Sequence, residues 1–199
     1  MSSDEIVRKP LRVRDRSSRT LDQRLALRFP RLTAAYIRLI FRLPPRSRFR
    51  QAAVRRGSQL SMEAFNRRDL DAVLIGTAPD VEHHPPREWV EVGFVEPCYR
   101  GRAGYREYVS SWSDVWGDDL RLEAVEVIDL GDRLMLLGDM PTSGMASGVP
   151  ITNKFATVSE LKEGVTIRVR VYFDQSKALE AVGLPETDRP GSENPEPRA

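Results

Sequence analysis

The chain has 199 residues, of which 40% are hydrophobic and 30% are charged, and its net charge is +2. This composition is typical of a soluble globular protein large enough to bury a core. Its single cysteine, Cys98, excludes a disulfide framework and a cysteine-rich zinc site, and no apolar run is long enough to span a membrane. The cytoplasm is the expected location.

Charge is divided unevenly along the chain. Residues 1–56 hold 16 of the 31 Lys and Arg residues but only 4 of the 29 Asp and Glu residues, so they carry +12 and residues 57–199 carry −10. A basic segment therefore precedes an acidic one. This asymmetry indicates that the first segment meets an anionic surface, and the chain's own acidic part is one such surface.

Residues 1–50 are predicted to form a basic, partly helical extension. Residues 1–19 are polar and Arg-rich without periodicity, which predicts disorder. Thr20 and Gln23 fit a capping box that starts a helix. Pro30 then divides a helical pattern into two short helices or one kinked helix. The apolar positions of this pattern are Leu25, Phe29, Leu32, Tyr36, Leu39 and Leu43, which we call the apolar stripe.

The apolar stripe is expected to be covered, because a single helix of this length is marginal in water without tertiary packing. We favour docking on the chain's own acidic domain or on a partner subunit. The alternative is contact of the basic helices with a membrane surface. No nucleic acid partner is expected.

Residues 51–184 are predicted to form one domain that begins with helices. One helix is expected over 46–66, and Asp69 is a suitable N-cap for a short second helix. A short strand over 81–84 follows, with no strand expected before it, and a loop over 87–98. The third helix starts after Gly101 and has one aromatic face, formed by Tyr105, Tyr108, Trp112 and Trp116.

The second half of this domain changes to strands. Four are expected, separated by turn signals and by a Gly- and Ser-rich loop over 141–150: they cover 120–130, 134–140, 151–161 and 165–173. A short helix over 175–182 ends at Gly183. Residues 185–199 are predicted to be a disordered acidic and Pro-rich tail. Helices followed by a strand meander indicate an α+β fold with an antiparallel sheet.

Five segments in this order resemble the nuclear transport factor 2-like superfamily, which includes SnoaL-like polyketide cyclases, ketosteroid isomerase and limonene-epoxide hydrolase. They are MEAFNRRDLDAVL (62–74), PDVEHHPP (79–86), YRGRAGYREYVSSW (99–112), VIDLGDRLMLLG (127–138) and VRVYFDQSKALEAVGL (169–184). The resemblance implies a curved, mostly antiparallel sheet packed by three helices around a cone-shaped pocket. Because this fold hosts enzymes and non-catalytic binders, it leaves the function open.

Glu82 and His84 are two residues apart on a predicted strand and so share a face, which we expect to point toward the helices. In ketosteroid isomerase the catalytic base lies in a similar strand just before a proline. The resemblance therefore implies that His84, which precedes Pro85, is the counterpart of that base. No metal site is predicted, because adjacent strand residues such as His83 and His84 point to opposite faces and the chain has no third histidine.

Further pocket residues are expected around this strand. Trp89 and Tyr99 lie at loop positions near the predicted mouth of the cone, where aromatic walls suit an apolar ligand. Arg170, Tyr172 and Asp174 share one face of the last predicted strand and would form a polar end to the pocket. For Asp174 the competing interpretation is an N-cap of the helix that follows it.

Two functions remain open from the sequence. The protein is predicted to hold a small apolar or polycyclic molecule, without a cofactor and with no defined reaction. The alternative is an enzyme of the polyketide cyclase, isomerase or hydrolase type with His84 as general base. A homodimer is also predicted: if the polar face of the last strand lines the pocket, its apolar face needs an external cover.

Overall fold

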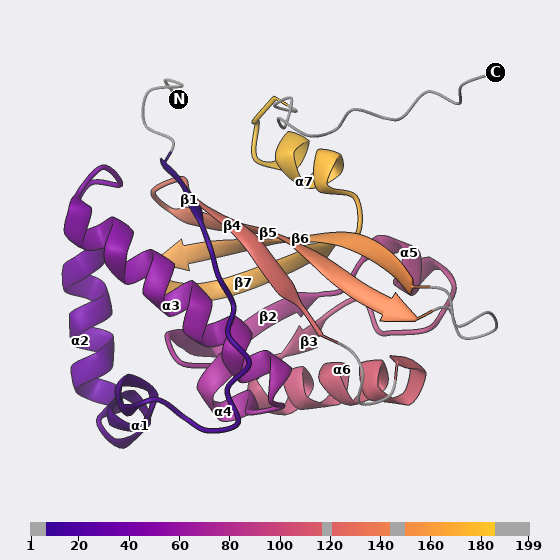
Figure 1. Cartoon of the computed structure of the whole chain (residues 1–199), viewed down its shortest axis with the longest axis horizontal. Coiled ribbons are helices and arrows are strands. Elements are labelled where there is room, and N and C mark those ends of the chain that lie inside the picture. The colour runs from indigo at the N-terminus through magenta and orange to yellow at the C-terminus, as the bar shows by residue number, and fades with distance from the viewer. Residues whose placement is uncertain (1–6, 117–120, 144–149, 186–199) are drawn as a thin grey trace.

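The computed structural model describes residues 7–116, 121–143 and 150–185, and shows helices packed against one seven-stranded sheet (Figure 1). The predicted α+β class is confirmed. The elements in chain order are β1 (Val7–Pro10), α1 (Leu21–Arg28), α2 (Pro30–Phe41), α3 (Arg48–Asn66), α4 (Leu70–Val73), β2 (Thr77–His84), α5 (Arg87–Glu91), β3 (Tyr99–Arg100), α6 (Gly101–Trp116), β4 (Glu123–Asp129), β5 (Arg133–Ser143), β6 (Pro150–Lys162), β7 (Val165–Tyr172) and α7 (Gln175–Ala181).

The sheet has the strand order β1-β4-β5-β6-β7-β2-β3. Every neighbouring pair is antiparallel except β2 and β7, so the predicted mostly antiparallel sheet is confirmed. The sheet is open, and β1 and β3 are its edges. Helices α3, α4 and α6 lie on one side of it and α7 lies on the other (Figure 1).

Two apolar cores follow from the alternation of side chains along the strands. We call the side toward α3, α4 and α6 the inner face, and the side toward α7 the outer face. On β4, for example, Val127 belongs to the inner core and Ile128 to the outer core. The inner core also contains Phe65, Val81, Tyr99, Tyr105, Tyr108 and Phe155, and the outer core contains Met135, Leu137, Val158, Leu179 and Val182.

The N-terminal segment contradicts the prediction of disorder and the expectation that no strand precedes 81–84. Residues Val7–Pro10 form β1, which pairs antiparallel with β4, and Leu11 is buried in the inner core. This edge strand is held by backbone hydrogen bonds, which a polar sequence without periodicity can form as well as an apolar one. Strand β2 also begins earlier than predicted, at Thr77.

The two helices predicted in the extension are present. Thr20 and Gln23 form the capping box of α1, and Pro30 opens α2. The apolar stripe is not covered, however, which contradicts the docking prediction: five of its six residues are exposed, with exposures between 47% and 68%. Helix α2 instead packs through its other side, where Ile37 lies beside Gly76 and Phe41 beside Gly164.

The extension is anchored to the domain by a buried ion pair that the sequence did not suggest. Arg50, in the first turns of α3, donates two hydrogen bonds of 2.7 Å to Asp129 at the end of β4, and both side chains are almost fully buried. The same guanidinium donates to the carbonyl oxygens of Phe41, Leu43 and Gly131. Because all of these donors are used, the turn between α2 and α3 is fixed to the turn between β4 and β5.

Other local differences concern loops. Residues Arg87–Glu91 form the short helix α5 inside the predicted loop, and β5 and β6 extend to Ser143 and from Pro150 into the loop predicted over 141–150. The remainder of that loop, the tail beyond Pro185 and the side chains of Trp112 and Trp116 lie outside the described residues.

Candidate functional site

Strand β2 divides its side chains between the two faces of the sheet. Val81 and His83 are buried on the inner face, whereas Glu82 and His84 point to the outer face, where Glu82 pairs with Arg168. The prediction that Glu82 and His84 point toward the helices is therefore wrong. It chose the wrong one of two alternating sets, and a shift of one residue exchanges every inner side chain of a strand for an outer one.

His83 is a buried polar residue of the inner face, on the second strand from the β3 edge of the sheet. Its ring lies 4.3 Å from the ring of Tyr105 on α6, measured between centroids. Across the strands its register neighbours are Tyr99 on β3 and Val169 on β7. His83 is 5% exposed, and its Nε2 atom has no hydrogen-bond partner among the described residues. A buried polar atom without a partner is unusual in a folded protein and calls for an explanation.

Tyr99 is held beside His83 by close packing of α6. Its ring stacks on that of Tyr108 with 5.3 Å between centroids, and its hydroxyl accepts a hydrogen bond from the backbone N–H of Glu96. Gly104 in the first turns of α6 permits this approach, because a Cβ atom there would lie only 3.1 Å from the Tyr99 backbone. The helix thus lies directly against the strand pair that carries His83.

Two neighbouring groups of the inner site, His83 and Tyr105, are uncharged at neutral pH. Burial lowers the pKa of His83 to about 4, and the neighbouring His84 adds to this effect. Burial also raises the pKa of Tyr105, although the positive charge of Arg68 acts in the opposite direction. His83 is therefore a neutral imidazole and Tyr105 a neutral phenol, two hydrogen-bonding groups in apolar surroundings.

Aromatic residues continue the inner surface toward α5. Trp89 lies 4.8 Å from Phe173 and 5.2 Å from Phe94, both in edge-to-face arrangements, and all three are partly buried against the inner core. Trp89 and Tyr99, the two aromatic residues predicted to line a pocket, are thus on the same side of the sheet as His83.

The outer face of β2 and β7 carries a network of ion pairs. Arg168 donates to Glu82 and to Glu160 at 2.8 Å each, and Arg100 reaches the second oxygen of Glu82, also at 2.8 Å. The hydrogen bond from Arg168 is the main reason why the pKa of Glu82 is lowered to about 2, and His84, 3.3 Å away, contributes further. This face carries several charged pairs, whereas His83 and Tyr105 on the inner face are neutral.

The outer network contains the group of side chains that best approximates a metal site. One ligand atom each of Glu82, His84 and Cys98 lies within 4.8 Å of the other two. Both oxygens of Glu82 are already paired with guanidinium groups, from Arg168 and Arg100, so a dication would meet two like charges beside its only carboxylate ligand. The arrangement fits a charged hydrogen-bond network better than a metal centre.

The polar residues predicted on the last strand do not meet His83. Arg170 and Tyr172 point to the outer face with Arg168, and Tyr172 packs against the outer core beneath α7. Asp174 caps α7 and accepts hydrogen bonds from the backbone N–H groups of Ser176 and Lys177, as the competing interpretation expected.

This arrangement removes the argument for a homodimer. The apolar set Val169, Val171 and Phe173 belongs to the inner face, where Val171 is buried and the ring of Phe173 packs against Trp89, so it is not the free outer surface that the dimer argument assumed. The homodimer itself stays a prediction.

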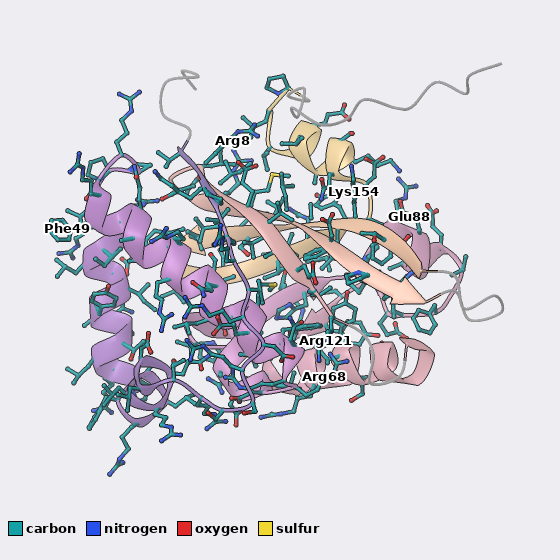
Figure 2. All side chains as sticks on the ribbon, viewed as in Figure 1. Arg8, Phe49, Arg68, Glu88, Arg121 and Lys154 are labelled. Carbon is teal, nitrogen blue, oxygen red and sulfur yellow. The ribbon has the colours of Figure 1, made fainter. Side chains whose placement is uncertain are left out.

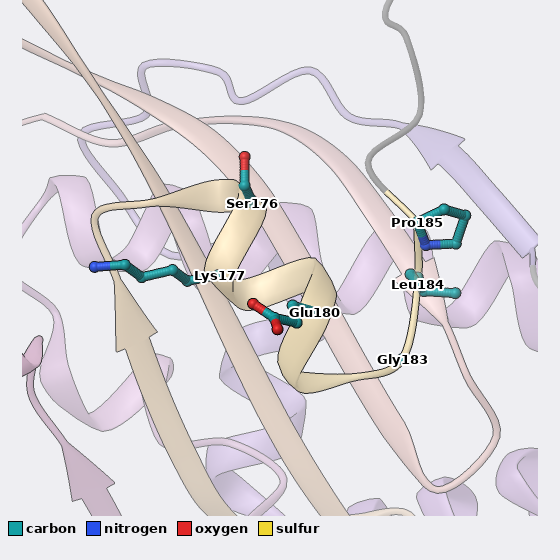
Figure 3. A pocket seen from close by; sticks show the side chains of 6 residues that line it. All are labelled: Ser176, Lys177, Glu180, Gly183, Leu184 and Pro185. Atoms are coloured by element: carbon teal, nitrogen blue, oxygen red, sulfur yellow. The ribbon is translucent and has the colours of Figure 1, made fainter.

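A surface depression of about 480 Å³ lies beside α7, and neither His83 nor the ion pairs of Glu82 line it (Figure 3). It is open to solvent and lined by Ser176, Lys177, Glu180, Gly183, Leu184 and Pro185. None of these side chains forms a catalytic arrangement with the others, so the depression offers no site chemistry comparable to that around His83.

An open curved sheet with helices over an inner face rich in aromatic residues defines a cone-type α+β protein. The chain belongs to the SnoaL-like domain family, which matches residues 59–169. The resemblance inferred from the five segments is thereby confirmed. No curated protein matches the chain.

Two solved structures are similar to it over most of their own length. TerC co-crystallised with polyporic acid is 27% identical, with a TM-score of 0.52 over 63% of this chain and 94% of TerC. An NTF2-like protein of unknown function from Burkholderia pseudomallei K96243 is 26% identical, with a TM-score of 0.52 over 64% of this chain and 95% of that protein. Within the described residues, no helix combines the length and apolar character that crossing a membrane requires.

Proposed function

We propose that the protein binds a small, mostly apolar molecule against the inner face of the sheet, with His83 as the polar anchor. The observation that carries this proposal is the buried Nε2 atom of His83, which lacks a hydrogen-bond partner among the described residues. Leaving such a group unpaired costs about 1–3 kcal/mol. A ligand with one hydrogen-bonding group opposite Nε2 would recover this free energy on binding.

The surroundings of His83 suit an aromatic or polycyclic ligand. The rings of Tyr99, Tyr105 and Trp89 supply apolar contact area, and ligand sites typically combine such walls with few polar groups. The similarity to TerC, which was crystallised with polyporic acid, supports the same class of ligand.

Holding a ligand is favoured over acid–base catalysis at this position. A base whose pKa is about 4 captures a proton weakly near neutral pH, where general bases work best with a pKa close to the working pH. The alternative enzyme, of the cyclase, isomerase or hydrolase type with His84 as general base, stays a prediction. It would require a substrate on the outer face, where His84 lies beside Glu82.

The test compares the two adjacent histidines. Polyporic acid is titrated by calorimetry into the parent protein, His83→Ala and His84→Ala. We expect His83→Ala to weaken binding by about tenfold or more, which corresponds to one lost hydrogen bond and its packing. His84→Ala should bind like the parent protein. Equal affinities for all three proteins, or a loss only in His84→Ala, would refute the proposed anchor.

A further inference from the structure

The outer side of helices α1 and α2 is an apolar surface that no part of the described chain covers. Its members recur at helical spacing within each of the two helices, which meet at Phe29, and we call this exposed set the strip. The exposed residues are Leu21, Leu25, Phe29, Leu32, Tyr36 and Leu39. Phe49, 78% exposed, projects from the same edge of the molecule (Figure 2).

This surface is not needed to hold the helices in place. Helix α2 docks through its opposite side, where Ile37 and Phe41 contact the domain, and Arg50 fixes the turn that follows. Gln23 of α1 donates to the carbonyl of Leu60 on α3. A helix that is apolar on both sides is normally buried on both. The second side of α2 is therefore suited to binding a partner.

The charge around the exposed strip restricts the chemistry of that partner. Residues 20–49 contain seven arginines and a single acid, Asp22, which is paired with Arg56. Of the seven, only Arg38 has an acidic partner of its own among the described residues, Glu163. The others are exposed around the strip: Arg24, Arg28, Arg31, Arg42, Arg46 and Arg48. The surface is thus apolar along its middle and positive along its rim.

We propose that this surface binds an anionic lipid membrane, with the leucine and aromatic side chains inserted at the interface and the arginines against the headgroups. Amphipathic helices with arginine on the polar side and Leu or Phe on the other bind membranes in this way. Each basic residue near an anionic surface strengthens this attraction. A second copy of the chain is a weaker candidate, since a two-fold contact places the same surface on both subunits and would bring two arginine rims together.

The experiment measures sedimentation of the full chain with two kinds of vesicle, phosphatidylcholine alone and phosphatidylcholine mixed with phosphatidylglycerol. We expect binding to the mixed vesicles, little binding to the neutral ones, and a decrease at high salt. The double variant Leu32→Ser and Leu39→Ser should bind the mixed vesicles about tenfold or more weakly, because two apolar side chains no longer insert. Both positions are exposed, so the melting temperature should stay unchanged.

Val92→Ser is the control. Val92 is also an exposed apolar residue, with 76% exposure, but it follows α5 and is far in the sequence from α1 and α2. It should bind vesicles like the parent protein. Absence of binding to anionic vesicles would overturn the proposal. So would binding that the double variant retains in full, since charge alone would then explain it. A dimer that the double variant dissociates, without vesicle binding, would assign the surface to a second copy.

Discussion

His83 and His84 are neighbours in the chain and in opposite environments. His83 is buried against Tyr105 with its Nε2 unpaired, and its pKa is lowered to about 4. His84 lies on the outer face, within 3.3 Å of Glu82, which is itself paired with Arg168 and Arg100. One residue type therefore serves two different purposes, because strand alternation places one copy among apolar rings and the other in a charged network.

The contrast extends from the two histidines to the faces that carry them. The inner face around His83 is mostly apolar and aromatic, and the Nε2 atom of His83 has no hydrogen-bond partner among the described residues. The outer face of β2 and β7, by contrast, pairs its charges with one another. Ligand binding should therefore depend on the inner face, and changes in the outer ion-pair network should have small effects on stability and binding.

The largest effect is expected from removing an inner ring. Tyr105→Ala should lower the free energy of unfolding by about 3–5 kcal/mol, since it leaves a cavity beside His83 in a packed core. Urea denaturation measures the change. Tyr36→Ala is the control, because Tyr36 is 55% exposed on α2 and its loss should change stability by no more than about 0.5 kcal/mol. Similar losses in both variants would show that packing of the Tyr105 ring beside His83 does not stabilise the fold.

The pH dependence of stability should reveal the buried His83. The pKa of His83 is about 4 in the folded protein and 6.5 for an ordinary histidine, so the unfolded chain binds more protons between these values. The contribution of the neutral His83 to the free energy of unfolding is therefore fully present above pH 6.5. It falls by about 3 kcal/mol as the pH drops to 4. Glu82 and Asp69, whose pKa values are lowered from 4.5 and 3.8 to about 2, lose their contributions as the pH falls from about 4.5 toward 2, so they overlap with His83 only at the acid end of this window. Denaturant midpoints measured across the range should show the slope, and His83→Gln should flatten it.

The smallest effect is expected on the outer face. Arg168→Ala removes two ion pairs, with Glu82 and Glu160, but all three side chains are partly exposed to solvent. Pairs of this kind contribute about 0–1 kcal/mol each and are screened by salt. The variant should therefore lose little stability and leave polyporic acid binding unchanged. A loss comparable with that of Tyr105→Ala would show that the outer network, rather than the inner rings, maintains the sheet.

Much of the fold could be predicted from the sequence because it depends on local signals. The capping box at Thr20, the break at Pro30 and the turn after Leu130 all act over a few residues. The strand β1 and the pair Arg50–Asp129 could not be predicted in this way. β1 is held by backbone hydrogen bonds, and the two ion-pair partners are 79 residues apart.

The side of the sheet that each β2 residue faces was predictable from the alternation of apolar and polar residues around Val81. Val81 is apolar and lies between the acids Asp80 and Glu82, so alternation favours a buried Val81 and, two residues on, a buried His83. The prediction chose His84 instead, because that residue precedes Pro85 as the catalytic base precedes a proline in ketosteroid isomerase. The apolar stripe was predicted to be covered because its composition favours burial. It is exposed because α2 contacts the domain through its other side, with Ile37 and Phe41.

The most direct test of the account is the response of the two histidines to a ligand. The chain has no other histidine, so the ring nitrogen signals of isotopically labelled protein are assigned with the His83→Ala and His84→Ala variants. On addition of polyporic acid, the account predicts a large change in the Nε2 signal of His83 and almost none for His84. A ligand that changes His84 and leaves His83 unaltered would contradict the assignment of the inner face as the binding site.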